Sequence, residues 1–443
     1  SFPTRRSSDL LILKLAHLQP DYIDLEYDAD SSIFIDLNNK YPQIKIICSY
    51  HNNNNQEKQL DLPYIDSIFK KILNTTKDYN IDNYKLIFHA HNSLDNFALL
   101  KFLSDINQLP EYTSRVTAHC MGVHGLFSRI LGKRFGNKFT YSLLNDFGDD
   151  FARSVNGIKT DELLEIYNYR NINQHTKIFC LIGNPVSSSV GHLFHNKYYK
   201  DHNINAIYIK ILINDPVELN EFFKWFKILS FAGCSVTMPY KTGLADYLNS
   251  SSTDLSIPIN TVRNNNNDLY GINTDGGATV DLLLEHESEV KKCLVGHKDI
   301  KDKKILILGA GGAAHGIVAE FSKYHPKKMT IINRSYHKAE KLIQPYSCEV
   351  LTVDDACEAT CQSDLSEKYD YIINTVSFNL DNIEKNILTT RITKILTLYA
   401  NSETLYLDIN YNHHENIDRS CINVSGYQMY VRQAIKQINY WLS

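Results

Sequence analysis

Residues Ile305–Ala314 read Ile-Leu-Ile-Leu-Gly-Ala-Gly-Gly-Ala-Ala, and this stretch decides the fold of the second half of the chain. Its apolar, β-branched beginning predicts a strand, and the closely spaced glycines before small helix-forming residues predict a tight turn into a helix. Such a turn brings backbone N–H groups and a helix N-terminus close to a pyrophosphate. About twenty residues later, Thr330–Asn333 predicts a second strand. The stretch therefore indicates a dinucleotide-binding domain built on a parallel sheet.

The end of the second predicted strand indicates which dinucleotide fits. NAD-binding domains of this kind place an acidic residue there for the ribose hydroxyls, whereas this chain has Asn333 and Arg334. A guanidinium would meet a 2′-phosphate with charge-assisted hydrogen bonds. We therefore expect NADP as the cofactor. The residues expected to bind it are Gly309, Ala310, Gly311, Gly312, Ala313, Asn333, Arg334, Ser335 and Lys338.

Length and composition narrow the class of protein. The 443 residues suffice for two or three domains. Charged residues make up 22% with a net charge of -4, so no basic field for nucleic acid is present. The nine cysteines form no C-x-x-C pair, which fits a reduced cytoplasmic compartment and predicts no metal site. No run of eighteen apolar residues predicts a membrane span. Residues 1–10 match neither a strand nor a helix opening, and we treat them as doubtful sequence.

Between residues 11 and 160, short apolar strands alternate with helical stretches, which predicts parallel strands joined by crossover helices. Helices are expected at Leu62–Thr75 and Leu94–Asn107. The expected strands are Tyr22–Tyr27, Lys45–Tyr50, Lys85–Ala90, Arg115–Cys120 and Phe139–Leu143.

Three side chains near these strands could carry chemistry: His51, Lys85 and Arg129. In α/β barrels, catalytic groups gather at the carboxyl ends of the strands. A buried lysine is a candidate imine former, because desolvation frees its amine to attack a carbonyl. The structural alternatives are that Lys85 reaches solvent, that His51 is a satisfied loop histidine and that Arg129 caps a helix end.

A resemblance to a known family bears on these candidates. Residues Met121–Leu131 read Met-Gly-Val-His-Gly-Leu-Phe-Ser-Arg-Ile-Leu, and with Phe135-Gly136 and Phe139-Thr140 they resemble the closing part of class I 3-dehydroquinate dehydratases. The resemblance implies that Lys85 forms a Schiff base with 3-dehydroquinate and that His51 shuttles the proton. It also implies that Arg129 binds the substrate carboxylate and that Ser154 contacts the substrate.

The same stretch departs from that family. The family folds as an eight-stranded barrel, whereas only five strands are expected before the linker. We therefore expect residues 11–160 to form an incomplete barrel that lacks its first three βα units, with their arginines and the acidic partner of His51. On that basis we expect no imine at Lys85. The family's Ser-Ala-Pro-Gly-Gln is Ser154-Val155-Asn156-Gly157-Ile158 here, so a glutamine is lost as well.

The second half holds a second set of candidates. The strand predicted in Phe231–Lys241 ends in Thr-Met-Pro-Tyr-Lys, which places Lys241 after a proline-fixed turn. Gly271–Gly276 places Asp275 in a glycine-flanked loop just before a helix. A lysine and an aspartate that face one cleft form a proton-transfer pair. The structural alternative is a surface ion pair of little energetic value.

Ordered motifs across residues 178–443 resemble the shikimate dehydrogenase family. They are Gly183-Asn184-Pro185, Val236-Thr237, Asn260-Thr261, Asn273-Thr274-Asp275-Gly276, the Gly309 turn, Asn333-Arg334 and Gly426–Ala434. The resemblance implies that Lys241 and Asp275 are catalytic. It further implies that Ser189, Thr237, Asn260, Tyr411 and Gln433 bind the substrate's carboxylate and hydroxyls.

Two positions depart from this pattern. Gly191 replaces a serine, and Ser235 stands where asparagine is usual. Loss of one hydroxyl contact weakens carboxylate binding by about 1 kcal/mol unless a neighbour such as Ser187 or Ser188 compensates.

Together these observations predict an α/β protein. The expected modules are an incomplete dehydratase barrel (11–160), a helix and linker (161–176), a substrate-binding domain (177–284 and 415–443) and a Rossmann NADP domain (285–414). The expected reaction is NADPH-dependent reduction of 3-dehydroshikimate to shikimate. The alternatives are a quinate/shikimate dehydrogenase that uses NAD, and a catalytically silent NADP-binding protein. The sequence carries no signal for a particular oligomeric state.

Overall fold

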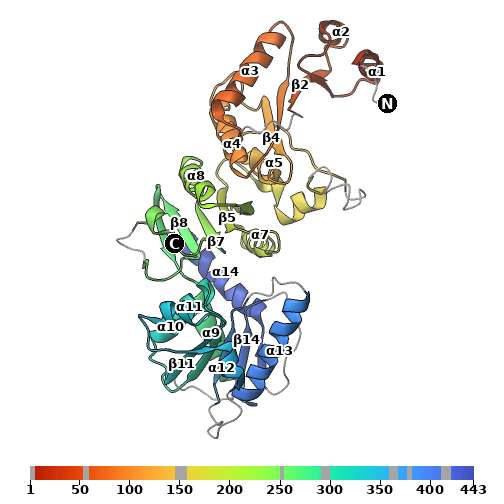
Figure 1. Cartoon of the computed structure of the whole chain (residues 1–443). Helices are drawn as coiled ribbons and strands as arrows, with labels where there is room; N and C mark the ends of the chain where they lie inside the picture. Colours follow the sequence, from red (N-terminus) through yellow and green to blue (C-terminus); the bar gives the residue numbers. More distant parts are fainter. Residues whose placement is uncertain are drawn as a thin grey trace. The chain divides into compact units, whose positions relative to one another are not determined.

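The computed structural model describes residues 5–52, 59–144, 157–249, 254–290, 300–358, 368–376, 382–410 and 421–443. The chain forms two compact units, Ser1–Ala232 and Gly233–Ser443. Figure 1 labels their helices and strands.

The first unit begins with an open parallel sheet and its helices. Strands β1 to β4 pair in the order β1-β2-β3-β4, and all three pairings are parallel. The predicted alternation of strands and helices is therefore confirmed. The elements are α1 (Arg5–Ala16), β1 (Tyr22–Glu26), α2 (Ser31–Lys40), β2 (Lys45–His51), α3 (Leu62–Thr76), β3 (Asn83–His89), α4 (Leu94–Ile106), β4 (Val116–Met121), α5 (Leu126–Leu131) and η1 (Gly132–Phe135).

The prediction of a fifth strand at Phe139–Leu143 is wrong. In this segment only Leu143 forms an isolated parallel bridge, with Lys159. Side chains take part in the segment's hydrogen bonding where a ladder was expected: the N–H of Phe139 donates to Thr117 Oγ1 at 3.3 Å, and Thr140 Oγ1 donates to the carbonyl of Arg129 at 3.2 Å.

The single helix that Thr160–Arg170 predicts is also not formed. A π-helical turn, η2 (Glu162–Ile166), and a 3₁₀ turn, η3 (Tyr169–Asn171), take its place. Asn168 between them has a φ of 49°, in the left-handed region, which ends one turn before the next begins.

The first unit continues through β5 (Lys177–Gly183), α7 (Gly191–Asp201), β6 (Ala206–Leu212) and α8 (Pro216–Ile228), and β5 pairs with β6 in parallel. Helix α8 begins where it does because Asp215 accepts hydrogen bonds from the N–H groups of the first turn and Pro216 needs no partner there. An aromatic cluster joins α8 to α4, since the ring of Phe97 contacts those of Phe222 and Phe231.

The second unit opens with an antiparallel ladder, β7-β8-β9, and then forms a six-stranded sheet. The sheet order β12-β11-β10-β13-β14-β15 corresponds to the 3-2-1-4-5-6 arrangement of dinucleotide-binding domains. Its elements are β7 (Gly233–Val236), η4 (Ala245–Tyr247), β8 (Thr261–Asn265), β9 (Asp268–Ile272), α9 (Asp275–Val290), β10 (Lys304–Leu308), α10 (Gly312–Ser322), β11 (Lys328–Asn333), α11 (Tyr336–Ile343), β12 (Glu349–Thr352), α12 (Val353–Glu358), β13 (Tyr371–Asn374), α13 (Asn382–Tyr399), β14 (Leu405–Asp408), β15 (Ile422–Val424) and α14 (Gly426–Leu442).

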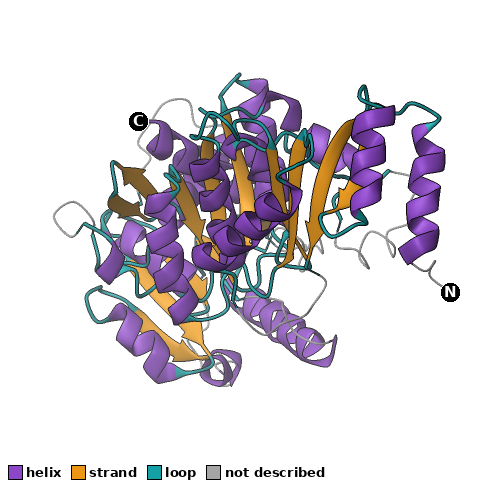
Figure 2. Ribbon diagram, turned by 90° about the horizontal axis from the view of Figure 1, so that it is seen from above, coloured by secondary structure: helices purple, strands orange, loops and turns teal. Residues whose placement is uncertain are grey.

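Strand β10 is buried on both faces, as its continuous apolar run predicts. Ile305 and Ile307 belong to the core cluster that includes α9 and α10, whereas Leu306 and Leu308 belong to the cluster that includes α12 and α13. Figure 2 shows the strands with helices around them. Helices therefore enclose the strand that leads into the glycine turn.

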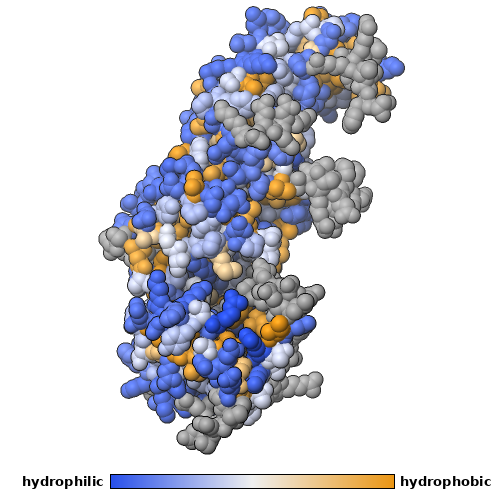
Figure 3. Space-filling model, in the orientation of Figure 1, coloured by the Kyte–Doolittle hydropathy of each residue, from blue (hydrophilic) through white to orange (hydrophobic). Residues whose placement is uncertain are grey.

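The molecular surface in Figure 3 is mainly hydrophilic, with scattered hydrophobic residues. Among the described residues, no helix is both long and apolar enough to cross a bilayer.

Candidate active site

The glycine turn after β10 has the geometry of a phosphate cradle. Gly309 has a φ of +99°, and a Cβ there would lie 2.7 Å from Thr375 Oγ1, so a larger residue is excluded. Nothing lies within 4 Å of the Cβ position of Gly311. No side chain caps the N-terminus of α10, so its first N–H groups face the space beside the turn. The residues present therefore fit a dinucleotide pyrophosphate.

Exposed cations lie beyond β11, as the sequence predicts. The amide of Asn333 donates to the carbonyl of Ser335 at 2.8 Å and shapes the turn into α11. Arg334 and Lys338 are exposed. Within the described ranges, neither of them has a carboxylate partner. Both can therefore meet a phosphate group.

Lys241 and Asp275 lie in direct contact. Lys241 Nζ donates to Asp275 Oδ2 at 2.5 Å, and the side chains are 16% and 4% exposed. Lys241 follows β7, and Asp275 opens α9, so two separate loops bring them together. The alternative of a surface ion pair is excluded for this pair by its burial.

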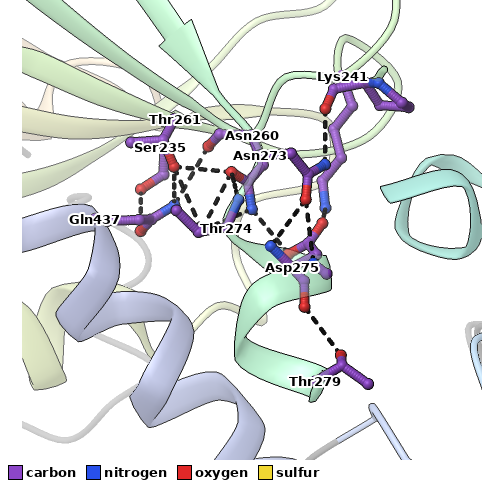
Figure 4. Close-up of polar contacts among 11 residues, drawn as sticks. Ser235, Lys241, Asn260, Thr261, Asn273, Thr274, Asp275, Thr279 and Gln437 are labelled. Carbon is purple, nitrogen blue, oxygen red and sulfur yellow. Dashed lines mark hydrogen bonds and ion pairs between the residues drawn. The ribbon is translucent and has the colours of Figure 1, made fainter. Parts of the chain in front are cut away.

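The carboxylate of Asp275 has a second donor. Asn260 Nδ2 donates to Asp275 Oδ1 at 2.8 Å (Figure 4). Asn273 Oδ1 accepts from the N–H groups of Asp275 and Gly276, at 2.9 and 3.2 Å, and so caps α9. Both carboxylate oxygens are therefore satisfied, and the helix start that carries Asp275 is held in place.

The lysine also lies against the glycine turn. A Cβ at Gly312 would lie 3.4 Å from Lys241 Cβ and Cδ. The proton-transfer pair and the first residue of α10 are therefore neighbours within one unit.

The serine-rich loop after β5 lies in the first unit. Lys210 on β6, which the sequence analysis missed, donates to the carbonyls of Ser187 and Ser189 at 3.2 and 3.4 Å. A Cβ at Gly191 would lie 3.2 Å from Ser189 Oγ and 3.3 Å from the ring of Tyr208. The packing of Tyr208 therefore favours glycine where the resemblance expects serine.

The remaining predicted substrate ligands have different placements. Thr237 and Gln433 are half-buried in the second unit. Tyr411 and Ser154 lie outside the described residues. The amide of Gln437, one helical turn after Gln433, is buried and contacts Asn260 and Thr261, and it carried no motif by which the sequence could identify it.

One face of the first parallel sheet holds the other candidates. In-register pairing aligns Glu26 with Ser49 and Ser49 with Lys85, so their side chains share a face. Lys85 Nζ donates to Asp24 Oδ2 at 2.6 Å, and His51 Nδ1 donates to the carboxylate of Glu26. The expectation that the acidic partner of His51 is absent is therefore wrong. The alternation of Asp24 and Glu26 along β1 was the signal that could have identified them.

Burial and positive charge surround this face. Burial, and then the charges of Arg129, Lys85 and His51, hold the pKa of His119 well below its usual range. Burial also lowers the pKa of the Arg129 guanidinium. The ring of Tyr141 lies 4.8 Å from Lys85 Nζ, and its carbonyl accepts from Arg129. The structure thus brings Lys85, His51 and Arg129 into one electrostatic environment, which favours the resemblance over the separate structural roles.

Comparisons with known proteins agree with this arrangement. Three family models match in order: Type I 3-dehydroquinase over residues 1–174, the shikimate dehydrogenase substrate binding domain over 181–262, and shikimate / quinate 5-dehydrogenase over 290–425. A shikimate dehydrogenase (NADP(+)) of Methanococcus aeolicus is 30% identical over 285 residues, which cover 61% of this chain and 93% of that protein. The chain belongs to the shikimate dehydrogenase family.

A dehydroquinase module precedes the shikimate dehydrogenase module. The shikimate biosynthesis protein AroDE of Chlamydia pneumoniae is 29% identical over 442 residues, which cover 97% of this chain and 80% of that protein. The dehydroquinase match begins at residue 1, so it does not support the expectation of a shortened module.

A solved structure supports the fold of the shikimate dehydrogenase part. Shikimate 5-dehydrogenase from Listeria monocytogenes, in complex with shikimate and NAD, matches with a TM-score of 0.50 at 23% identity and covers 61% of this chain and 93% of that one.

Proposed function

We propose that the chain reduces 3-dehydroshikimate to shikimate with NADPH, a step of the shikimate pathway. The observation that carries the proposal is the buried contact between Lys241 and Asp275 beside Gly312. An acid–base pair next to a dinucleotide turn suits proton transfer coupled to reduction of a carbonyl.

The chain's own residues would divide the work as follows. Lys241 and Asp275 hold and deliver the proton at the C3 oxygen of the substrate, while Asn260 orients Asp275 and contacts a hydroxyl. Thr237, Gln433, Tyr411, Ser187 and Ser189 would complete the substrate contacts. NADPH supplies the hydride. The turn from Gly309 to Ala313 would hold its pyrophosphate, and Asn333, Arg334, Ser335 and Lys338 its 2′-phosphate.

We assign substrate binding to residues 177–284 and 415–443 and NADP binding to 285–414, and we place the reaction in the cytoplasm. Free thiols at the described residues Cys48, Cys120, Cys180 and Cys234 support a reducing compartment.

The proposal is tested by shikimate oxidation with NADP and, separately, with NAD. We expect turnover with NADP and a loss of at least about 10³-fold in kcat for Lys241→Ala, because the proton-transfer partner is removed. Lys224→Ala, at an exposed position on α8, serves as a folding control and should keep its kcat. A wild-type kcat no higher than that of Lys241→Ala would contradict the proposal and favour a silent NADP-binding protein. A clear preference for NAD would favour the quinate/shikimate alternative.

A second activity is favoured by the paired groups on the first sheet. Because Glu26 contacts His51 and Asp24 contacts Lys85, the module retains an imine-forming lysine next to an oriented proton carrier. We therefore revise the expectation from sequence and propose that Lys85 forms an imine with 3-dehydroquinate, releasing water, and that His51 moves the proton. Arg129 and Ser154 would contact the substrate.

Borohydride reduction in the presence of 3-dehydroquinate tests this activity. Mass spectrometry should find the reduced adduct on Lys85 and none in Lys85→Met. Wild-type protein without an adduct would contradict dehydratase chemistry and leave the dehydrogenase proposal intact.

A further inference from the structure

Gln437 contributes a buried amide to the site region from the inner face of α14. The residue is 3% exposed, and a primary amide at that depth requires hydrogen-bond partners. Its Oε1 accepts from Ser235 Oγ at 2.9 Å. Its Nε2 donates to Thr261 Oγ1 at 2.9 Å and to the carbonyl of Asn260 at 3.3 Å. Figure 4 shows these contacts reaching from α14 toward the start of α9.

The surroundings allow only one orientation of this amide. The carbonyl of Asn260 can only accept a hydrogen bond, so the nitrogen of Gln437 must face it. The oxygen then faces Ser235, whose hydroxyl supplies the proton. If the amide were reversed, Gln437 Oε1 would face the carbonyl oxygen of Asn260 in a buried space, and neither oxygen could donate a hydrogen bond.

This orientation directs the Thr261 hydroxyl, which acts on Asn260 together with the backbone of Thr274. Because Thr261 Oγ1 accepts from Gln437, its own proton is directed to Asn260 Oδ1, at 2.8 Å. Asn260 Oδ1 also accepts from the N–H of Thr274 at 2.9 Å. The Asn260 nitrogen is thereby turned to Asp275 Oδ1.

These contacts form a directed chain of hydrogen bonds through Gln437, Thr261 and Asn260 to Asp275. Every member is buried: the exposed fractions are 3%, 0%, 1% and 3%. Hydrogen bonds in such surroundings are not replaced by water when one is removed. A change at Gln437 therefore acts on Asp275 without contact between them.

We propose that Gln437 is a positioning residue for catalysis. Through Thr261 it adds a hydroxyl donor to Asn260 Oδ1, beside the backbone N–H of Thr274, and so holds the Asn260 amide rigidly against Asp275 for proton transfer with Lys241. This inference rests on the proposed dehydrogenase function. It differs from a purely structural role, in which Gln437 only attaches α14 to β8.

A variant at Trp441 distinguishes the positioning role of Gln437 from a purely structural one. Trp441 lies on the same helix, and its Nε1 donates to the carbonyl of Val262 on β8 at 2.9 Å, a residue outside the directed chain. Trp441→Phe therefore weakens the attachment of α14 to β8 and leaves the directed chain intact. Gln437→Leu weakens the same attachment and also interrupts the directed chain.

The experiment measures kcat and KM for shikimate oxidation with NADP, together with Tm, for the full chain. We expect both Gln437→Leu and Trp441→Phe to lower Tm. Only Gln437→Leu should lower kcat, by about tenfold, because the Thr261 hydroxyl is no longer directed to Asn260 and the Asn260 amide is held less rigidly against Asp275.

A double-mutant cycle tests the route. Thr261→Val should lower kcat by itself, and adding Gln437→Leu should then change kcat by less than about twofold, since the two act through one hydroxyl. A kcat within twofold of wild type for Gln437→Leu, or losses that multiply in the double variant, would overturn the proposal. A wild-type chain without turnover would instead overturn the proposed function and this inference with it.

Discussion

Each carboxylate oxygen of Asp275 has a hydrogen-bond donor inside the protein. Lys241 supplies one and Asn260 the other, while solvent reaches almost none of the side chain. A buried carboxylate without such donors costs several kcal/mol. The site is therefore arranged before any substrate arrives, which suits a group that must hold and release a proton at one fixed atom.

Arg334 is the one guanidinium among the four residues proposed to hold the 2′-phosphate. Arg334→Ala removes the exposed guanidinium at the end of β11, so we expect KM for NADP to rise about tenfold or more. KM for NAD, which has no 2′-phosphate, should stay within about twofold. Steady-state kinetics with both cofactors measures the ratio, and an equal change for the two would remove Arg334 from phosphate binding.

Single residues were predictable where a motif carries them. Lys241 and Asp275 stand in fixed sequence contexts, and the structure brings them into contact. Glu26 and Gln437 have no such context, because their partners His51 and Asn260 are distant in sequence. Only the pairing of β1 with β2 and the packing of α14 create those contacts.

Helices α9 and α10 approach each other more closely than side chains would allow. A Cβ at Gly276 would lie 2.3 Å from the carbonyl oxygen of Gly316, and a Cβ at Gly316 would lie 2.5 Å from the amide of Asn273. The glycines therefore set the separation of the two helices.

Gly276→Ala should destabilise the protein by about 1–3 kcal/mol, because the new methyl group meets rigid backbone. Gly277→Ala, one residue further on, is the matched control. Its Cβ would lie 3.6 Å from the flexible end of Lys436, and alanine is the better helix former. Urea unfolding of both variants measures the difference, and equal stability would show that α9 can move away from α10.

Regular elements followed the hydrophobic pattern, and irregular ones did not. The apolar run Ile305–Leu308 became a buried central strand, as its residues predict. Phe139–Leu143 alternates apolar residues with Thr140 and Ser142, as a half-buried strand would, but the side chains of Thr117 and Thr140 take part in its hydrogen bonding. In Thr160–Arg170, Asn168 in the left-handed region breaks a helical pattern. Neither of these effects can be predicted from the hydrophobic periodicity of the sequence.

At the scale of the whole molecule, three described histidines of the first unit have a pKa that burial lowers. Burial lowers the pKa of His192 and of His195 to about 4, with the charge of Lys210 also acting on His192, and it holds the pKa of His119 well below its usual range. Because the folded-state pKa lies below the unfolded value of about 6.5, the unfolded chain binds protons first as the pH falls. The folding stability that these histidines contribute is fully present above pH 6.5 and is lost as the pH falls from 6.5 to about 4.

We therefore expect Tm to fall between pH 7.5 and pH 5, and to fall less in His195→Gln. Glutamine can still donate to the carbonyl of Gly191, which His195 Nδ1 contacts at 2.9 Å, but it takes up no proton. Thermal scans at the two pH values test this, and an identical fall in the variant would assign the acid sensitivity to other groups.

The crossing of α9 and α10 has a consequence for how such an enzyme can diversify. Asp275 is the first residue of α9, and the glycine turn at Gly309–Gly311 leads into α10. The spacing between the two helices is set by Gly276 and Gly316, where no side chain separates their backbones. Arg334, which we propose contacts the 2′-phosphate, follows a different strand, β11. Selection can therefore change the preferred dinucleotide without retuning the acid–base centre.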